Sequence, residues 1–185
     1  MKNTKLKLNI AFFVLLVLFL GFFAPSAKAI RIGLNEGIEK TYIGSTQNAV
    51  FTDVYSNNTL FIARSFFPYS IKAYGNSIAI KVKGRYYDCS TSAIHVHNPD
   101  KKGFLATKRK WYRGDIIVYN VDGKLTIVNT LPLEEYLLGV VPSEMPSRWN
   151  IEAQKAQAIA ARSYAIANMN KRNSKGYDLK DTPQD

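Results

Sequence analysis

The sequence predicts an α+β fold, because a strand-rich segment is followed along the chain by a helix-rich one. Residues 30–104 are rich in β-branched and aromatic residues and are interrupted by turn residues, which is typical of short strands. A hairpin is expected after Gly114, and two helices after the hairpin, the second of them long and rich in alanine. Strands first and helices last is the order typical of an α+β protein.

The first 29 residues have the pattern of a secretory signal peptide. Three lysines precede an apolar run over residues 10–23. Ala27-Lys28-Ala29 then has the small-x-small pattern of a cleavage site. The apolar run is shorter than the roughly 20 residues that cross a bilayer. We therefore expect cleavage after Ala29 and export to the cell envelope, either extracellular or periplasmic. An uncleaved N-terminal membrane anchor is the alternative.

Composition and charge narrow the classes of partner. The chain has 25 Lys+Arg against 14 Asp+Glu, a formal charge of +11. A basic exported protein is attracted to anionic surfaces such as wall polymers, lipid headgroups or extracellular polysaccharide. No recognised nucleic-acid motif accompanies the charge, so nucleic acid is not an expected partner. The single cysteine, Cys89, excludes an internal disulfide framework and a multi-cysteine metal cluster.

The strand-rich segment carries three clear strand patterns, over Ala49–Tyr55, Leu60–Ala63 and Ser77–Val82. Asn57-Asn58 and Tyr74-Gly75-Asn76 are predicted turns. The polar stretch over residues 98–103 marks the end of this region, so we place a boundary near residue 104.

The predicted hairpin joins two strand-like runs, Ile116–Asn120 and Lys124–Asn129, through Val121-Asp122-Gly123. An Asp-Gly pair tolerates the positive φ of a tight turn, which favours an antiparallel hairpin.

Two helices are predicted after the hairpin. The first runs from Pro132 to Leu138 and is expected to end at Gly139, because proline suits a helix start and glycine a helix stop. The second begins after Asn150, a suitable N-cap, and runs from Ile151 to about residue 169. Its predicted packing face, which is expected to lie at the centre of the domain, consists of Ala153, Ala156, Ile159, Ala160, Ser163, Ile166 and Ala167.

Glu144, between the two helices, is the candidate for chemistry. It lies among Val, Pro and Met in the sequence, and poor hydration would favour the protonated form that a general acid needs. The structural alternative is that Glu144 caps the following turn or pairs with Arg148 or Arg162. The residues alone leave both interpretations open.

Several ordered motifs resemble the stage II sporulation protein D (SpoIID)/LytB family. They are Tyr112-Arg113-Gly114, Val128–Leu137, Gly139–Pro146, Glu152–Ala165 and Asp181–Asp185. On this basis residues 105–185 form a domain that resembles the family, preceded by the strand-rich region 30–104 and the leader 1–29. The resemblance implies a bacterial envelope protein that acts on peptidoglycan. It implies either a lytic transglycosylase that cuts denuded glycan strands, as in the sporulation branch, or a non-catalytic enhancer of a cell-wall amidase, as in the LytB branch.

The resemblance assigns the family's catalytic glutamate to Glu144. In the implied mechanism this carboxyl protonates the oxygen between MurNAc and GlcNAc, then takes the proton of the muramoyl C6 hydroxyl as an anhydro ring closes. One carboxyl serves as acid and then base, because the nucleophile belongs to the substrate. Candidates for holding the sugar through hydrogen bonds or ring contacts are Ser143, Lys155, Gln157, Arg162, Tyr136, Trp149 and Tyr164.

No metal and no cofactor are expected. Some family members carry a His/Cys zinc cluster downstream of the catalytic glutamate, and residues 176–185 contain neither residue type. His95 and His97 would lie on one face of a strand, but the sequence identifies no third ligand. The family domain continues past the Asp-Thr-x-Gln segment, so we expect this chain to hold the N-terminal part of that domain.

Overall fold

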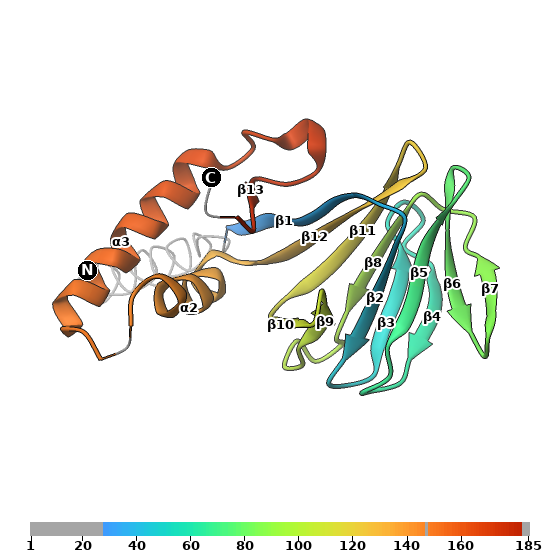
Figure 1. The fold of residues 1–185 in the computed structure, drawn as a ribbon, viewed down its shortest axis with the longest axis horizontal. Coiled ribbons are helices and arrows are strands. Elements are labelled where there is room, and N and C mark those ends of the chain that lie inside the picture. Colours follow the sequence, from blue (N-terminus) through green and yellow to red (C-terminus); the bar gives the residue numbers. More distant parts are fainter. Residues whose placement is uncertain (1–27, 147, 183–185) are drawn as a thin grey trace, which may run out of the picture.

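A computed structural model describes residues 28–146 and 148–182, and it places two β-sheets face to face with a pair of helices at one end (Figure 1). The predicted α+β class is confirmed. The predicted leader, residues 1–29, lies outside the described residues except for its last two positions.

The larger sheet has seven strands in the order β13-β1-β12-β11-β8-β3-β4. Its strands are β1 (Ala29–Ile38), β3 (Ala49–Asp53), β4 (Thr59–Ala63), β8 (Ala93–His97), β11 (Asp115–Val121), β12 (Lys124–Pro132) and β13 (Leu179–Lys180). Neighbouring strands are antiparallel except β1 and β13, which are parallel.

The smaller sheet has six strands in the order β10-β9-β2-β5-β6-β7. They are β2 (Lys40–Ser45), β5 (Tyr69–Tyr74), β6 (Ser77–Val82), β7 (Arg85–Asp88), β9 (Leu105–Thr107) and β10 (Lys110–Tyr112). Strand β1 leads almost directly into β2, so one stretch of chain serves both sheets.

Apolar side chains of both sheets meet in one buried core. Phe51 on β3 is 1% exposed, and its ring centroid lies 6.3 Å from that of Tyr69 on β5 in the facing sheet. Edge-to-face ring pairs of this kind add to the stabilisation that burial provides. The largest fully buried aliphatic residues of this core include Ile43, Ile71, Ile94, Leu105, Ile116 and Leu125.

The strands predicted from sequence are present, with bounds within one or two residues of the expected ones except for β12, which continues three residues further, to Pro132. The hairpin between β11 and β12 closes with the pair Val121 and Lys124, and both Asp122 and Gly123 have positive φ, 51° and 76°. This is the conformation for which an Asp-Gly pair is suited.

Helix α2 (Leu133–Glu144) is longer than predicted, because the expected stop at Gly139 is wrong. Glycine ends a helix when it adopts a left-handed conformation, and Gly139 is not among the glycines with positive φ. Leu133 and Leu137, four residues apart, are buried and hold the helix against the rest of the chain. The helix therefore continues through Pro142 and places Glu144 in its last turn.

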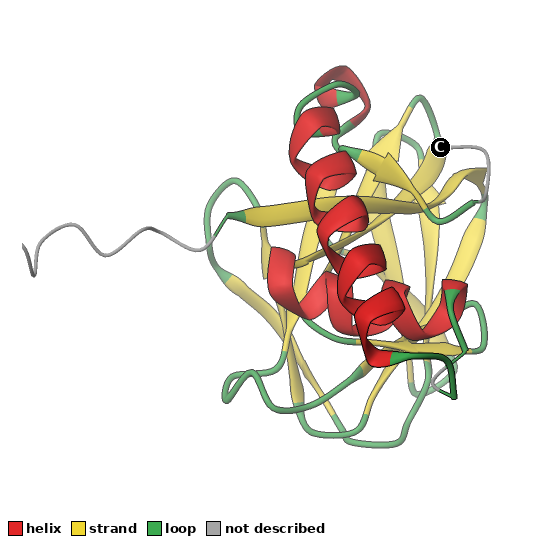
Figure 2. Cartoon of the chain, turned by 90° about the vertical axis from the view of Figure 1, so that its left-hand side faces the viewer, coloured by secondary structure: helices red, strands yellow, loops and turns green. Residues whose placement is uncertain are grey.

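Helix α3 (Ile151–Asn168) begins where predicted, with the Asn150 side chain accepting a hydrogen bond from the Glu152 backbone N–H at 2.8 Å. Its predicted packing face is wrong. Ile159 and Ile166 are 62% and 43% exposed, whereas Ala165 and Asn168 are buried. Alanine occurs on several sides of this helix, so hydrophobic periodicity alone does not distinguish the packed face. Figure 2 shows α3 crossing in front of α2 and the sheets.

After α3 the chain passes through a short 3₁₀ helix (Asn173–Lys175) and returns to the sheet as β13, an element that the sequence patterns did not predict. Asp178 accepts hydrogen bonds from the Arg31 guanidinium and from the backbone N–H groups of Arg31 and Asn170. The ring of Tyr177 lies over Gly33, where a Cβ atom would come within 2.9 Å of it. These contacts fasten the end of the described chain to β1.

Within the described part of the chain, no helix is both long and apolar enough to cross a membrane.

Candidate functional site

Glu144 and Gln157 meet where α2 and α3 face one another. The Gln157 side-chain amide donates a hydrogen bond to Oε2 of Glu144, although the two residues are separated by the turn between the helices. The carboxyl group is exposed. The poor hydration expected from its Val, Pro and Met neighbours is therefore wrong. Successive side chains of a helix point in directions about 100° apart, so these apolar neighbours do not enclose the carboxyl.

The Glu144 carboxyl opens onto a cleft of about 390 Å³, which we call the Glu144 cleft. Its lining residues are Tyr136, Val140, Glu144, Gln157, Ala160, Ala161, Tyr164, Leu179, Lys180 and Thr182. They come from α2, from α3 and from the returning segment around β13. Among these lining residues Glu144 is the one carboxylate.

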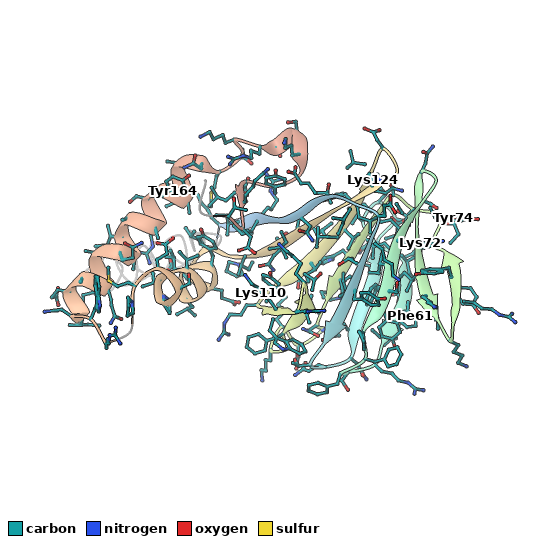
Figure 3. All side chains as sticks on the ribbon, viewed as in Figure 1. Phe61, Lys72, Tyr74, Lys110, Lys124 and Tyr164 are labelled. Carbon is teal, nitrogen blue, oxygen red and sulfur yellow. The ribbon has the colours of Figure 1, made fainter. Side chains whose placement is uncertain are left out.

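Two tyrosines form aromatic walls of this cleft. Tyr136 on α2 is half-buried and also packs against the apolar core, and Tyr164 on α3 is 43% exposed. Tyr164 is labelled in Figure 3, on α3. The structure thus brings Tyr136, Tyr164 and Gln157 to the same cleft as Glu144.

Arg162 and Lys155 lie outside the residues that line the Glu144 cleft. Arg162 forms a bidentate ion pair with Glu134, with Nε–Oε1 and NH2–Oε2 distances of 3.0 and 2.6 Å. The hydrogen bond from the Arg162 side chain lowers the pKa of Glu134. Lys155 pairs with Glu152 one turn away, at 2.8 Å. The alternative in which Glu144 pairs with Arg162 is therefore not the arrangement found.

Ser143 faces a second hollow that adjoins the Glu144 cleft. Its hydroxyl donates to the Val140 carbonyl at 2.8 Å, a bond within α2. This second hollow, which we call the middle hollow, has a volume of about 370 Å³. It shares Tyr136 and Val140 with the Glu144 cleft and extends to Trp111 on β10.

Lys180 and Thr182 belong to the cleft but were not among the candidates from sequence. Lys180 lies on β13 and pairs with Glu36 at 2.9 Å, so its ammonium group is held near the cleft by strand β1. Only the return of the chain to β1 brings these residues to α2 and α3, and a two-residue strand leaves no periodic signal in a sequence.

The other candidate groups of the sequence lie elsewhere. His95 and His97 share one face of β8, with ring centroids 4.9 Å apart, and His95 Nε2 lies 3.0 Å from Asp115 Oδ2. Within the described residues no group of three His, Cys, Asp or Glu residues is arranged to hold a metal ion. Burial raises the pKa of the Cys89 thiol to about 11, so the thiolate form that acts as a nucleophile is scarce at neutral pH.

Comparison with known proteins locates the similarity in the segment that carries this cleft. Residues 121–185 match the family model described as "SpoIID: Stage II sporulation protein". The resemblance to the SpoIID/LytB family is thereby confirmed for this part of the chain. The matched segment begins in the β11–β12 hairpin and includes α2, α3 and β13.

Three curated relatives are similar over limited stretches. A stage II sporulation protein D of Bacillus amyloliquefaciens is 49% identical over 59 residues, which cover 30% of this chain and 17% of the relative. An uncharacterized protein of Brachyspira hyodysenteriae is 41% identical over 64 residues, covering 35% and 17%. An amidase enhancer of Bacillus subtilis is 38% identical over 97 residues, covering 52% and 12%. The matches therefore span less than a fifth of each relative's length. No solved structure matches the chain.

Proposed function

We propose that this chain acts on the bacterial cell wall and that the Glu144 cleft cuts peptidoglycan glycan strands as a lytic transglycosylase. A cell-wall-related function is supported by the similarity to a stage II sporulation protein D and to an amidase enhancer. The observation that carries the finer proposal is the single carboxyl group of a cleft with tyrosine walls.

Chemistry with one carboxyl requires that the substrate supply its own nucleophile. Glu144 donates a proton to the glycosidic oxygen, which leaves with GlcNAc. The carboxylate formed then takes the proton of the muramoyl C6 hydroxyl, as the C6 oxygen bonds to the anomeric carbon. One glycosidic bond breaks, one anhydro bond forms, and the carboxyl group ends as it began. No water is consumed, so the second carboxylate of a hydrolase has no role.

The neighbours of Glu144 have distinct roles in this proposal. Gln157 holds Oε2 through its amide donor, which leaves Oε1 to exchange the proton. Tyr136 and Tyr164 offer ring faces to the apolar sides of sugar rings and hydroxyls to their polar edges. A bound strand would cover the exposed carboxyl and exclude water from the reacting bond.

The test compares Glu144→Gln with Glu152→Gln on denuded glycan strands, with anhydro-muramoyl products measured by mass spectrometry. Loss of a general acid/base typically lowers turnover by about 10²- to 10⁴-fold, and we expect Glu144→Gln to lose at least 100-fold. Glu152, an exposed glutamate of α3 paired with Lys155, is the matched control and is expected to have little effect. Undiminished product from Glu144→Gln would refute the catalytic role.

A non-catalytic role as an amidase enhancer is the second candidate, because the match to the Bacillus subtilis amidase enhancer covers 52% of this chain. This alternative predicts that the protein accelerates a purified cell-wall amidase on intact sacculi. It also predicts that Glu144→Gln leaves that acceleration unchanged, because no proton transfer is involved.

A further inference from the structure

A third hollow, larger than the two already described, lies on the outer face of the six-stranded sheet. We call it the sheet groove. It has a volume of about 640 Å³, and its lining includes Lys40, Tyr42, Gly44, Phe66, Phe67, Ala106, Lys108, Arg109 and Trp111. None of these residues belongs to the segment that matches the SpoIID family model, so that match assigns this groove no role.

Strand register explains the shape of the sheet groove. Trp111 on β10 is directly opposite Ala106 on β9, and Ala106 is directly opposite Gly44 on β2. Residues opposite one another on neighbouring strands point to the same face of a sheet. Two small residues thus form a floor beside the large ring of Trp111, and the Phe67–Pro68 backbone borders the floor beyond Gly44.

The aromatic side chains of the groove are unusually exposed for their size. Tyr42, Phe67 and Trp111 are each between 53% and 54% exposed, and Phe66 is 74% exposed. A contiguous cluster of exposed aromatic rings is typical of a binding surface. Rings that bind the flat faces of a ligand need this exposure.

Positive charge surrounds these rings. Lys40, Lys108 and Arg109 line the groove, and its lining includes no Asp or Glu. Lys40 Nζ lies 5.0 Å from the centroid of the Tyr42 ring. On the neighbouring strand β5, outside the groove lining, Lys72 Nζ lies 4.4 Å from the Tyr86 ring, and Figure 3 shows Lys72 beside Tyr74. The groove therefore suits a ligand that carries negative charge along its length.

The three hollows adjoin one another through shared lining residues. Trp111 lines both the sheet groove and the middle hollow, and Tyr136 and Val140 line both the middle hollow and the Glu144 cleft. Lys110, which lines the middle hollow, is labelled in Figure 3 on the side of the sandwich that faces α2. A polymer that passes from the Glu144 cleft to the sheet groove would cross the middle hollow, whose lining also includes the carboxylates of Glu135 and Asp181.

We infer that the sheet groove is a distal binding site for an anionic glycan strand. Its aromatic rings contact the sugar rings and its cationic side chains pair with the carboxylates of the same strand that reaches Glu144. A denuded glycan strand carries a lactyl carboxylate on each muramoyl residue, so it combines sugar rings with regularly spaced negative charge. The identity of the strand rests on the proposed function above. The binding site itself rests on the shape, exposure and charge of the groove.

The test measures the dissociation constants of long denuded glycan strands and of a short tetrasaccharide, in the full chain carrying Glu144→Gln to prevent cleavage. Gly44→Leu would fill the groove. It is compatible with the fold, because φ at Gly44 is not positive and an added Cβ would meet its nearest neighbours at 3.8 Å. Tyr42→Ala removes one wall. Tyr87→Ala is the matched control, since Tyr87 is 54% exposed on β7 and does not line the groove.

Truncation of an aromatic side chain that anchors a ligand typically weakens binding by about tenfold. We expect Gly44→Leu and Tyr42→Ala each to raise the dissociation constant for long strands by about that factor, with no change for the tetrasaccharide and no effect of Tyr87→Ala. Carboxyl-reduced strands should bind the unsubstituted groove more weakly than native ones. Thermal melting of each variant checks that the fold is retained.

Unchanged affinity of folded Gly44→Leu and Tyr42→Ala for long strands would overturn the inference. So would equal affinity for a single-stranded oligonucleotide of the same charge, since that result would indicate a general polyanion surface. Failure of the proposed function gives a different pattern, in which no anhydro product forms while the groove variants still weaken strand binding.

Discussion

The β-sandwich and the helical end of the molecule are held together by different forces. The sandwich buries large aliphatic and aromatic side chains from both sheets almost completely. The two helices bury only Leu133, Leu137, Ala165 and Asn168. The helical end instead makes polar contacts, of which the largely buried pair of Arg31 with Asp178 is the main one and the pair of Arg162 with Glu134 is exposed.

This difference implies that the β-sandwich is more rigid than the helical end, which carries the Glu144 cleft. Regions with few buried apolar contacts open at a lower free-energy cost than the core does. The Glu144 cleft is built from such a region, whereas the sheet groove is built on strands that belong to the core. A strand bound to both would therefore contact a rigid site in the sheet groove and a more mobile site in the Glu144 cleft.

The largest expected effect tests the sandwich. Phe51→Ala removes a ring that is 1% exposed and contacts aromatic residues of both sheets. Truncation of a buried phenylalanine typically lowers the free energy of unfolding by about 3–5 kcal/mol. Urea denaturation followed by circular dichroism measures the change, and a loss below about 1 kcal/mol would contradict a core centred on this ring.

The next effect tests the polar fastening of the helical end. Asp178→Ala removes the carboxylate that pairs with Arg31, and removal of one member of a largely buried pair typically costs about 3 kcal/mol. We expect hydrogen exchange to accelerate in α3 and β13 while β3, β8 and β11 stay protected. Uniform acceleration across both sheets would show that the two regions unfold as one unit.

The same pair predicts how stability depends on pH. Burial acts to raise the pKa of Asp178, but hydrogen bonds from Arg31 and the Asn170 backbone outweigh it, and the net pKa lies below its usual range. The contribution of this carboxylate is therefore complete above the ordinary Asp pKa of about 3.9, and it is lost as pH falls through the lower folded value. Asp178→Asn should reduce this acid-dependent loss of exchange protection in α3.

The smallest effect is a gain in the helical end. Gly139 lies inside α2 with φ that is not positive, and an added Cβ would meet nothing within 4 Å. Alanine is favoured over glycine inside a helix by about 0.5–1 kcal/mol. Gly139→Ala should therefore slow hydrogen exchange in α2 and leave the sandwich strands unchanged. Faster exchange in α2 would show that Gly139 is needed for a conformation that alanine does not adopt.

The sequence predicted local features well and tertiary ones poorly. The Asp122-Gly123 turn and the Asn150 N-cap were predicted because a few neighbouring residues determine them. The end of α2 was mispredicted, because buried Leu133 and Leu137 override the local signal of Gly139. The packed face of α3 was mispredicted, because alanine lies on several of its sides.

For the candidate site too, the sequence identified individual residues but not the contacts that the fold creates between them. Glu144 was selected from its motif, and Gln157 was among its predicted neighbours, but their hydrogen bond depends on the angle between two helices. Lys180 and Thr182 reach the cleft only through β13. The sheet groove was not predicted, because its walls come from strands distant in sequence and its floor depends on strand register.

The close approach of Tyr177 to Gly33 has an evolutionary consequence. A methyl group at position 33 would displace the ring of Tyr177, whose hydroxyl donates a hydrogen bond to Glu36 at 2.7 Å. Substitutions at positions 33 and 177 are therefore expected to be coupled, with a larger residue at 33 better tolerated beside a smaller residue at 177. Homologues that diverge at this contact should exchange both residues together, so the pair would appear as covariation between the two ends of the chain.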